Sequence, residues 1–104
     1  MTRAIFWSRE ALNDLRAQIA YIARDDRTAA LRVAERIGET GEALGKHPTG
    51  RRGRVTGTYE KSVPRLPYII AYAFAERTGK ESVVILRVVH TARNWPPEGW
   101  PELA

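Results

Sequence analysis

The chain has 104 residues and a formal net charge of +5, and 43% of its residues are hydrophobic. This length predicts one domain, and the hydrophobic share excludes a disordered chain. The absence of cysteine excludes disulfide bonds and thiolate metal sites, and two histidines are too few for an obvious zinc site, so we expect no metal and no cofactor. No apolar run approaches the ~20 residues that cross a bilayer, and the N-terminus is too soon followed by charge for a secretory signal. We therefore expect a small soluble protein of the cytoplasm without a membrane partner.

The excess positive charge lies in one stretch, residues 46–65, which we call the basic stretch. The segments before and after it are balanced, whereas it holds six cations against Glu60 alone. Such a patch suits nucleic acid or an acidic protein partner, and the simpler alternative is a solvated basic surface. Its cationic residues are Lys46, Arg51, Arg52, Arg54, Lys61 and Arg65.

The N-terminal part of the chain predicts a short strand over residues 3–7, followed by a helix. Ser8 is a suitable N-cap, and apolar residues then recur at helical spacing as far as Ala23. Polar positions of this helix, Gln18 among them, are expected to face water.

A second helix is expected after a short break, with Asp26 as its N-cap and Gly45 as its stop. Gly38 and Gly41 lower its helix propensity, and they would allow a neighbouring element to approach closely. Because the link between the two helices is short, we expect an antiparallel helical hairpin.

The C-terminal part predicts strands. Residues 67–74 and 83–90 are rich in β-branched and aromatic residues and are separated by a polar segment with Gly79, which predicts a hairpin. The second of these strands is apolar on both faces, as is typical of a central, covered strand. Before them, residues 46–53 are typical of a loop, and residues 54–63 predict a strand interrupted by a glycine.

The predicted order is therefore β-α-α-β-β-β, an α+β fold in which the helical hairpin packs on a small antiparallel sheet. We assign residues 1–96 to a single domain and residues 97–104 to an extended tail that contains proline and tryptophan. The tryptophans at this end either pack back on the fold or stay available to a partner.

An ordered set of short motifs runs through residues 4–96, and the closing one is the most specific. The motifs are Ala11-Leu12-Asn13-Asp14-Leu15 and Tyr21-Ile22-Ala23, Ala29-Ala30 through Arg36-Ile37, Pro48 with Gly50-Arg51, Arg54-Val55, Pro67-Tyr68-Ile69-Ile70 with Tyr72, and Ile85-Leu86-Arg87-Val88-Val89-His90 with Arg93 and Trp95. This set resembles the ParE branch of the RelE/ParE superfamily, the toxins of type II toxin–antitoxin (plasmid-stabilisation) modules.

The superfamily has two activities. ParE-like members bind DNA gyrase and stall replication, RelE-like members cleave mRNA on the ribosome, and a cognate antitoxin wraps and silences both. The resemblance implies a gyrase-inhibiting toxin that is neutralised by a ParD-like or similar antitoxin, with a RelE-like endonuclease acting on ribosome and mRNA as the alternative. A degenerate module that binds its antitoxin without being toxic is a third hypothesis. The basic stretch would face an acidic segment of the antitoxin or of another acidic partner.

The residues at the end of the last strand are candidates for contact with the target, because they leave a rigid support and include types enriched at interface hot spots. Each has a structural alternative. Arg87 would pair with Glu60 or with a helix acid, and His90 would only bond a nearby carboxylate or carbonyl. Trp95 would cap the core. The expected target-binding residues are Arg87, His90, Arg93 and Trp95.

A metal-independent endoribonuclease would need a base, an acid and cations at the phosphate. RelE-like nucleases resemble one another in having an aromatic hydroxyl or a paired acid–base group near the C-terminal end. Here that region offers Trp95, and no tyrosine follows Tyr72. We therefore favour a toxin without catalytic residues. Under the alternative, the catalytic residues would be His90, Arg93, Arg87 and Arg65.

Overall fold

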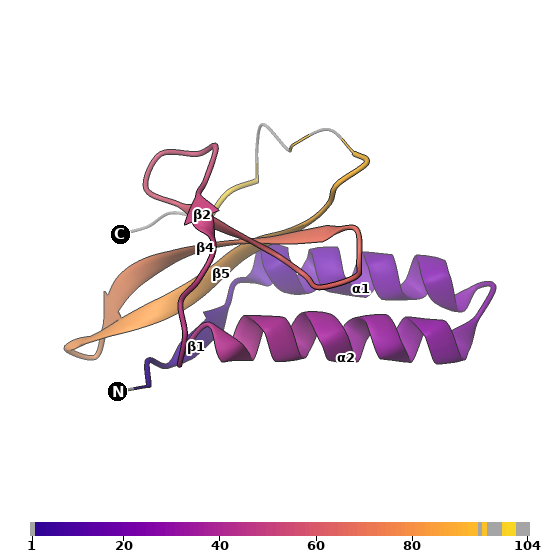
Figure 1. Ribbon diagram of the computed structural model, residues 1–104, viewed down its shortest axis with the longest axis horizontal. Coiled ribbons are helices and arrows are strands. Elements are labelled where there is room, and N and C mark those ends of the chain that lie inside the picture. Colours follow the sequence, from indigo (N-terminus) through magenta and orange to yellow (C-terminus); the bar gives the residue numbers. More distant parts are fainter. Residues whose placement is uncertain (1, 94, 96–98, 102–104) are drawn as a thin grey trace.

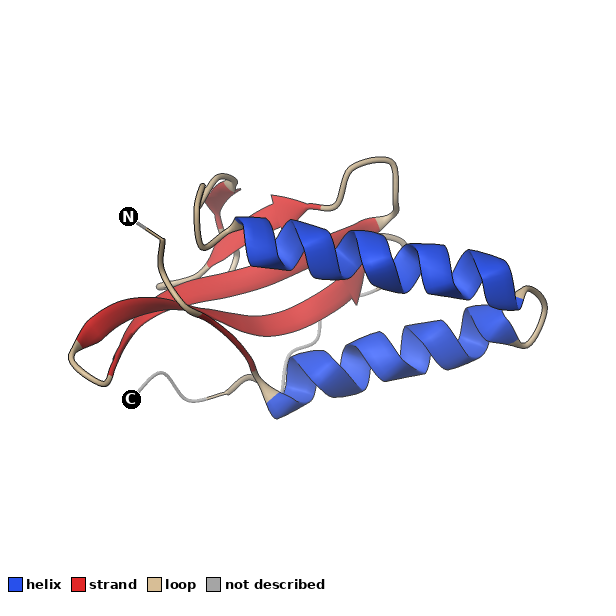
Figure 2. Ribbon diagram, turned by 90° about the horizontal axis from the view of Figure 1, so that it is seen from below, coloured by secondary structure: helices blue, strands red, loops and turns tan. Residues whose placement is uncertain are grey.

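The computed structural model describes residues 2–93, 95 and 99–101, and this part of the chain forms an α+β fold, as predicted. Two helices lie side by side on one face of a five-stranded sheet (Figures 1 and 2). No helix within the described ranges is long and apolar enough to cross a membrane. The elements in chain order are β1 (Ile5–Trp7), α1 (Arg9–Ala23), α2 (Arg27–Ala43), β2 (Arg51–Arg52), β3 (Tyr59–Ser62), β4 (Tyr68–Arg77) and β5 (Lys80–His90).

Both helices begin at the predicted caps. The Ser8 Oγ accepts a hydrogen bond from the Ala11 backbone N–H at 3.0 Å, and the Asp26 Oδ1 accepts one from the Ala29 N–H at 3.0 Å. These bonds satisfy donors that have no partner inside the helix. Ser8 also donates its hydroxyl proton to the carbonyl oxygen of Leu86 at 2.9 Å, so the cap ties the start of α1 to β5.

The sheet has the strand order β1-β5-β4-β3-β2 and is mixed, which corrects the predicted antiparallel sheet. The three pairs from β2 to β5 are antiparallel, whereas β1 runs parallel to β5, with Ile5 opposite Val83 and Trp7 opposite Ile85. Parallel pairing is possible because the chain between β1 and β5 is long enough to return to the same end of the sheet. β5 thereby becomes an interior strand, as its apolar sequence predicted.

The strand predicted over residues 54–63 is shorter than expected, and the predicted loop contains strand residues. β3 covers only Tyr59–Ser62, and Arg51–Arg52 pair with it as β2. Between them the chain turns at Gly57, whose φ is 82°. The Glu60 carboxylate accepts a hydrogen bond from the Arg54 N–H at 2.7 Å, which holds the turn against β3 instead of letting the strand extend.

The β4–β5 hairpin is present and longer than predicted. Its turn is formed by Thr78 and Gly79, with φ angles of 51° and 76°. Positive φ at both central residues matches the right-handed twist of the strands that they join. The pairing of the two strands shifts register between Ala71 and Tyr72, as at a β-bulge.

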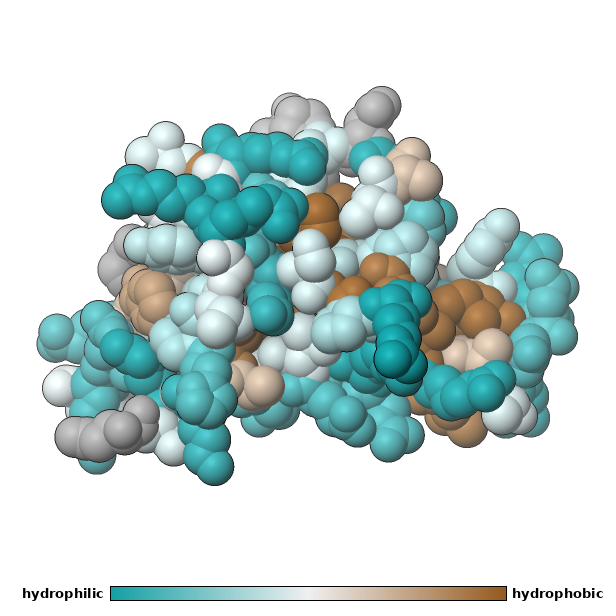
Figure 3. All heavy atoms as spheres, viewed as in Figure 1, coloured by the Kyte–Doolittle hydropathy of each residue, from teal (hydrophilic) through white to brown (hydrophobic). Residues whose placement is uncertain are grey.

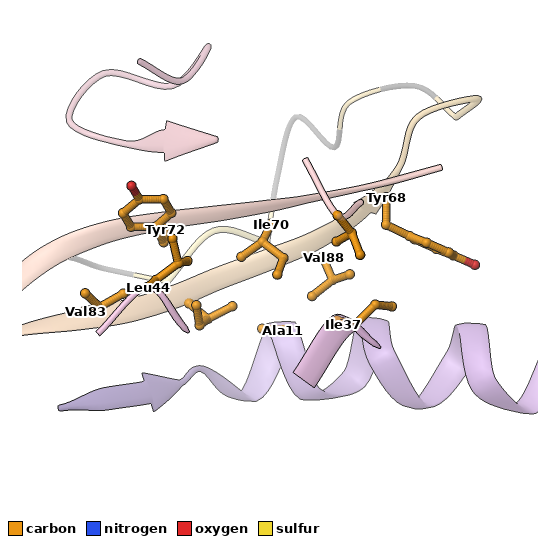
Figure 4. Close-up of a cluster of buried hydrophobic side chains, with 10 residues drawn as sticks. Ala11, Ile37, Leu44, Tyr68, Ile70, Tyr72, Val83 and Val88 are labelled. Carbon is orange, nitrogen blue, oxygen red and sulfur yellow. The ribbon is translucent and has the colours of Figure 1, made fainter. Parts of the chain in front are cut away.

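The main core lies between the helices and the sheet (Figure 4). Tyr68 and Tyr72, two even-numbered positions of β4, are buried there at 4% and 1% exposure. Burial raises the pKa of both hydroxyls, so they stay neutral at physiological pH. The buried members of this core are Ala11, Ile37, Leu44, Val63, Tyr68, Ile70, Tyr72, Val83, Ile85 and Val88.

Gly41 allows the close approach that its position predicted, although the neighbour is β1 and not a helix. A Cβ atom at Gly41 would lie 2.5 Å from Cζ2 of Trp7, too close to be accommodated without a shift, whereas a Cβ atom at Gly38 would meet nothing within 4 Å. The Trp7 indole also donates to Glu42 at 3.0 Å. The C-terminal end of α2 therefore packs directly against the Trp7 ring.

The described C-terminal residues 95 and 99–101, called here the C-terminal segment, lie on the side of the sheet away from the helices (Figure 1). Trp100 packs against a second cluster of Ala73, Val84 and Leu86. The Trp95 and Trp100 rings stack at a centroid distance of 5.8 Å. Of the two alternatives for these tryptophans, the structure has them packed back on the fold. Other residues of the predicted tail, 97, 98 and 102–104, lie outside the described residues.

Candidate partner-binding site at the end of strand β5

An ion pair between α1 and β5 forms the base of the candidate site. The Arg87 guanidinium donates to both carboxylate oxygens of Asp14, each at 2.8 Å, and the Val88 backbone N–H donates to Asp14 Oδ2 at 2.9 Å. Both side chains are mostly buried, with exposures of 17% and 16%. The hydrogen bond to Asp14 raises the pKa of Arg87, and burial acts in the opposite direction. Of the predicted alternatives, Arg87 pairs with a helix acid and not with Glu60.

Arg87 also connects this pair to the C-terminal segment. Its Nη1 donates to the carbonyl oxygen of Gly99 at 3.1 Å, and its guanidinium carbon lies 6.0 Å from the centroid of the Trp100 ring. One side chain therefore links helix, strand and tail. Arg87 is therefore largely engaged within the fold.

A small open pocket of about 120 Å³ lies beside this ion pair. Three of the four predicted target-binding residues, Arg87, His90 and Arg93, line it, together with Asp14 and Gln18. Val88 and Val89 complete the lining. Trp95 does not line the pocket, and neither does Arg65. Trp95 instead stacks on Trp100, and the Arg54 guanidinium lies 4.3 Å from its ring centroid.

A hydrogen bond to the His90 ring indicates which of its two nitrogens can act as a donor. Its Nδ1 accepts a hydrogen bond from the Ala92 backbone N–H at 3.1 Å, and its ring packs edge-on against Tyr68 at 5.2 Å. Because Nδ1 is an acceptor, the neutral ring carries its proton on Nε2. His90 can therefore act as a donor through Nε2.

Gln18 belongs to this site, although the sequence predicted that it would face water. It is only 7% exposed, and its Oε1 accepts a hydrogen bond from the Tyr68 hydroxyl at 3.3 Å. Asp14 and Gln18 are one turn apart on the same face of α1. That spacing, together with a charged arginine in an apolar strand, is the signal in the sequence that could have indicated this face.

The basic stretch contains one buried acid, Glu60, which pairs with two of its arginines. Glu60 is 1% exposed, and its carboxylate lies 3.1 Å from Nη2 of Arg51 and 3.8 Å from Nε of Arg54. Lys61 donates to the Thr49 hydroxyl at 2.8 Å. Strongly hydrophilic side chains gather over β2 and the loop that follows it (Figure 3). The remaining cations, which are exposed, are Lys46, Arg52 and Arg65.

Two solved structures share this architecture of two helices on a mixed sheet. The toxin–antitoxin structure described as "Chromosomal ParDE TA system from P. aeruginosa" matches with a TM-score of 0.75 at 22% identity, covering 86% of this chain and 96% of that one. The "YoeB/ParE toxin from Agrobacterium tumefaciens" matches with a TM-score of 0.56 at 12% identity, covering 84% and 97%. The fold is thus that of ParE and YoeB toxins.

Sequence comparisons identify the family. The profile of the family described as "ParE toxin of type II toxin-antitoxin system, parDE" matches residues 5–95. The "Putative toxin Y4kP" of Sinorhizobium fredii is 40% identical over 95 residues, covering 90% of this chain and 94% of the relative. "Toxin RelE2" of Caulobacter vibrioides is 36% identical over 90 residues, covering 86% and 96%. The chain belongs to the ParE toxin family, and the prediction of a type II toxin with a cognate antitoxin is confirmed.

Proposed function

We propose that this toxin inhibits DNA gyrase by direct binding, and that a ParD-like antitoxin neutralises it. The match of residues 5–95 to the ParE family is the observation that carries this proposal. ParE-like toxins of this superfamily resemble one another in acting on gyrase. In this chain, His90 and Arg93 would contact the target, while Arg87 holds the surrounding groups in place.

The chemistry of the pocket supports binding over RNA cleavage. Cleavage through the 2′-hydroxyl needs one group to take a proton and another to give one. The pocket carboxylate, Asp14, already accepts three hydrogen bonds, two from Arg87 and one from the Val88 N–H. Burial raises the pKa of the nearby Tyr68 hydroxyl, which makes it a weaker proton donor, and the hydroxyl already donates to Gln18 Oε1. Among the lining side chains, His90 alone is then left for proton transfer, whereas cleavage needs two such groups.

A ribosome-dependent endoribonuclease is the second candidate, and the name of one relative, "Toxin RelE2", favours it. It would use His90 as base and Arg93 at the scissile phosphate, with Arg87 supporting them. Arg65 would have to act from outside the pocket, because it does not line it. This candidate predicts mRNA cleavage that requires ribosomes and is lost in His90→Ala.

The test of the proposal is direct binding of purified toxin to purified gyrase, measured by calorimetry or surface capture. We expect Arg93→Ala to weaken binding by about 1–3 kcal/mol, the scale of an interface hot spot. Arg32→Ala, which removes an exposed arginine of α2, is the matched control and should leave gyrase affinity unchanged. Equal affinities of the two variants would remove Arg93 from the interface, and no binding by the unmodified toxin would refute the proposed target.

A further inference from the structure

The side chains of the pocket at the end of β5 offer hydrogen-bond donors, because their acceptors are already engaged. Both Asp14 oxygens are bound by Arg87, and Gln18 Oε1 is bound by the Tyr68 hydroxyl. His90 Nδ1 is bound by a backbone N–H. What these side chains still present to the pocket are the Gln18 amide nitrogen, the His90 Nε2 and the Arg93 guanidinium. A group that accepts hydrogen bonds from several directions fits such a site.

Gln18 is the most specific sign that the pocket is built to hold a ligand. Its side chain is more than nine-tenths buried, and it lines the pocket. Within the described residues its amide nitrogen donates no hydrogen bond, although its oxygen is occupied. The amide nitrogen is not among the buried atoms that lack a partner, so it keeps some access to solvent, and a ligand in the pocket can accept its hydrogen bond.

The charge of the pocket selects an anion with one negative charge. The Asp14 charge is balanced by Arg87, which leaves the positive charge of Arg93 in the pocket. Arg93 lies close enough to Tyr68 to act on the pKa of its hydroxyl, so its charge is felt inside the pocket. A volume of about 120 Å³ holds a carboxylate head group. A carboxylate matches the planar guanidinium in two hydrogen bonds and balances its charge.

We propose that this pocket binds the carboxylate of an aspartate or glutamate side chain on the protein that the toxin inhibits. The proposal rests on the proposed function only for the identity of that protein. Arg93 would pair with the carboxylate, and Gln18 and His90 would donate to its oxygens. Asp14 and Arg87 are positioning residues, which hold the wall of the pocket without contacting the ligand.

The pocket can be tested without the target by nuclear magnetic resonance. The probe is glutamic acid blocked as its N-acetyl methylamide, titrated into the isotope-labelled toxin, with the equivalent glutamine compound as the uncharged control. We expect saturable shifts of the Gln18 amide, the His90 ring and the Arg93 side chain with the acidic probe alone. Equal shifts with the glutamine compound, or none with either, would overturn the proposal. Tighter binding of inorganic phosphate would overturn it too, by assigning the pocket to a nucleic-acid backbone.

Two variants test, in the same titration, which residues bind the probe. Arg93→Gln should weaken the acidic probe by about tenfold or more, because a charge-assisted pair is lost, whereas Arg32→Gln should not change it. Gln18→Glu places a carboxylate inside the pocket itself, and we expect it to abolish probe binding in a protein that is still folded at the temperature of the titration. Undiminished probe binding by a folded Gln18→Glu protein would contradict the assignment.

The same variants separate this proposal from the choice of target. If the unmodified toxin inhibits gyrase and Arg93→Gln inhibits it equally, the carboxylate pocket is wrong while the proposed function stands. If the unmodified toxin leaves gyrase unaffected, the proposed function is wrong, and the probe titration still decides whether the pocket binds a carboxylate.

Discussion

Arg87 is the charged residue in the apolar middle of β5, and its ion pair with Asp14 determines whether that strand can be buried. A guanidinium among valines and isoleucines is stable only when a partner and several hydrogen bonds replace its hydration. Asp14 supplies both, and it also accepts from the Val88 N–H. The same carboxylate therefore stabilises the fold and shapes the pocket.

Asp14→Asn tests whether the ion pair with Arg87 stabilises the fold. The substitution keeps the size of the side chain but leaves the mostly buried Arg87 without its counter-charge, and we expect it to destabilise the protein by about 2–3 kcal/mol. The measurement is urea-induced unfolding. The control is Asp25→Asn in the exposed turn between the helices, expected to change stability by no more than about 0.5 kcal/mol. Equal stability of the two variants would contradict the structural role of Asp14.

At the scale of elements, two glycines of the same helix should respond oppositely to alanine. Gly38→Ala should stabilise the protein by about 0.5–1 kcal/mol, because alanine favours the helix and nothing lies within 4 Å of the added atom. Gly41→Ala should destabilise it by about 1–3 kcal/mol, because the added atom would overlap the Trp7 ring. Thermal unfolding of both variants measures this difference in stability. A gain in stability for both would show that α2 does not pack closely against Trp7.

The C-terminal segment is the second element whose role can be measured. Trp95 stacks on Trp100 and lies under the Arg54 guanidinium, so Trp95→Ala should cost about 1 kcal/mol or more. For a domain of this size that corresponds to a fall of about 4–8 °C in melting temperature. Trp95→Phe retains a ring and should lose less. An unchanged melting temperature together with lost gyrase binding would instead place Trp95 in the target interface.

At the scale of the whole molecule, the uneven charge distribution predicts salt-dependent binding of the antitoxin. The basic stretch should steer an acidic antitoxin segment, so the affinity should fall as salt rises while apolar contacts retain part of it. Arg52→Glu is the suitable charge reversal, because Arg51 and Arg54 are engaged with the buried Glu60. Lys80→Glu, at the tip of the β4–β5 hairpin, is the matched control.

Affinities measured at two salt concentrations decide this prediction. We expect Arg52→Glu to weaken antitoxin binding and reduce its salt dependence, and Lys80→Glu to do neither. A complex that responds to neither salt nor Arg52→Glu would show that the basic stretch is an ordinary solvated surface.

Much of the fold could be predicted because the deciding signals are local. Ser8 and Asp26 cap the helices as expected, and the hairpin strands follow from their β-branched sequences. The parallel pairing of β1 was missed because it joins residues about eighty positions apart, and no local pattern encodes it. β2 was missed because a two-residue strand has no periodicity.

The candidate site was predicted less completely, for a related reason. Arg87, His90 and Arg93 could be chosen because they are polar groups at the end of an apolar strand. Asp14 and Gln18 join them only through tertiary packing of α1, which the sequence did not rank above other helix faces. The packing of Trp95 on Trp100 likewise depends on where the chain turns after β5.

We propose that this ParE-family toxin acts on gyrase and not on mRNA. The most direct measurement titrates one toxin preparation into two reactions in parallel, supercoiling by purified gyrase and translation by purified ribosomes. The account predicts inhibited supercoiling that is reversed by the antitoxin, with translation and mRNA intact at the same toxin concentration. Unaffected supercoiling at high toxin excess, with mRNA cleaved in the presence of ribosomes, would contradict it.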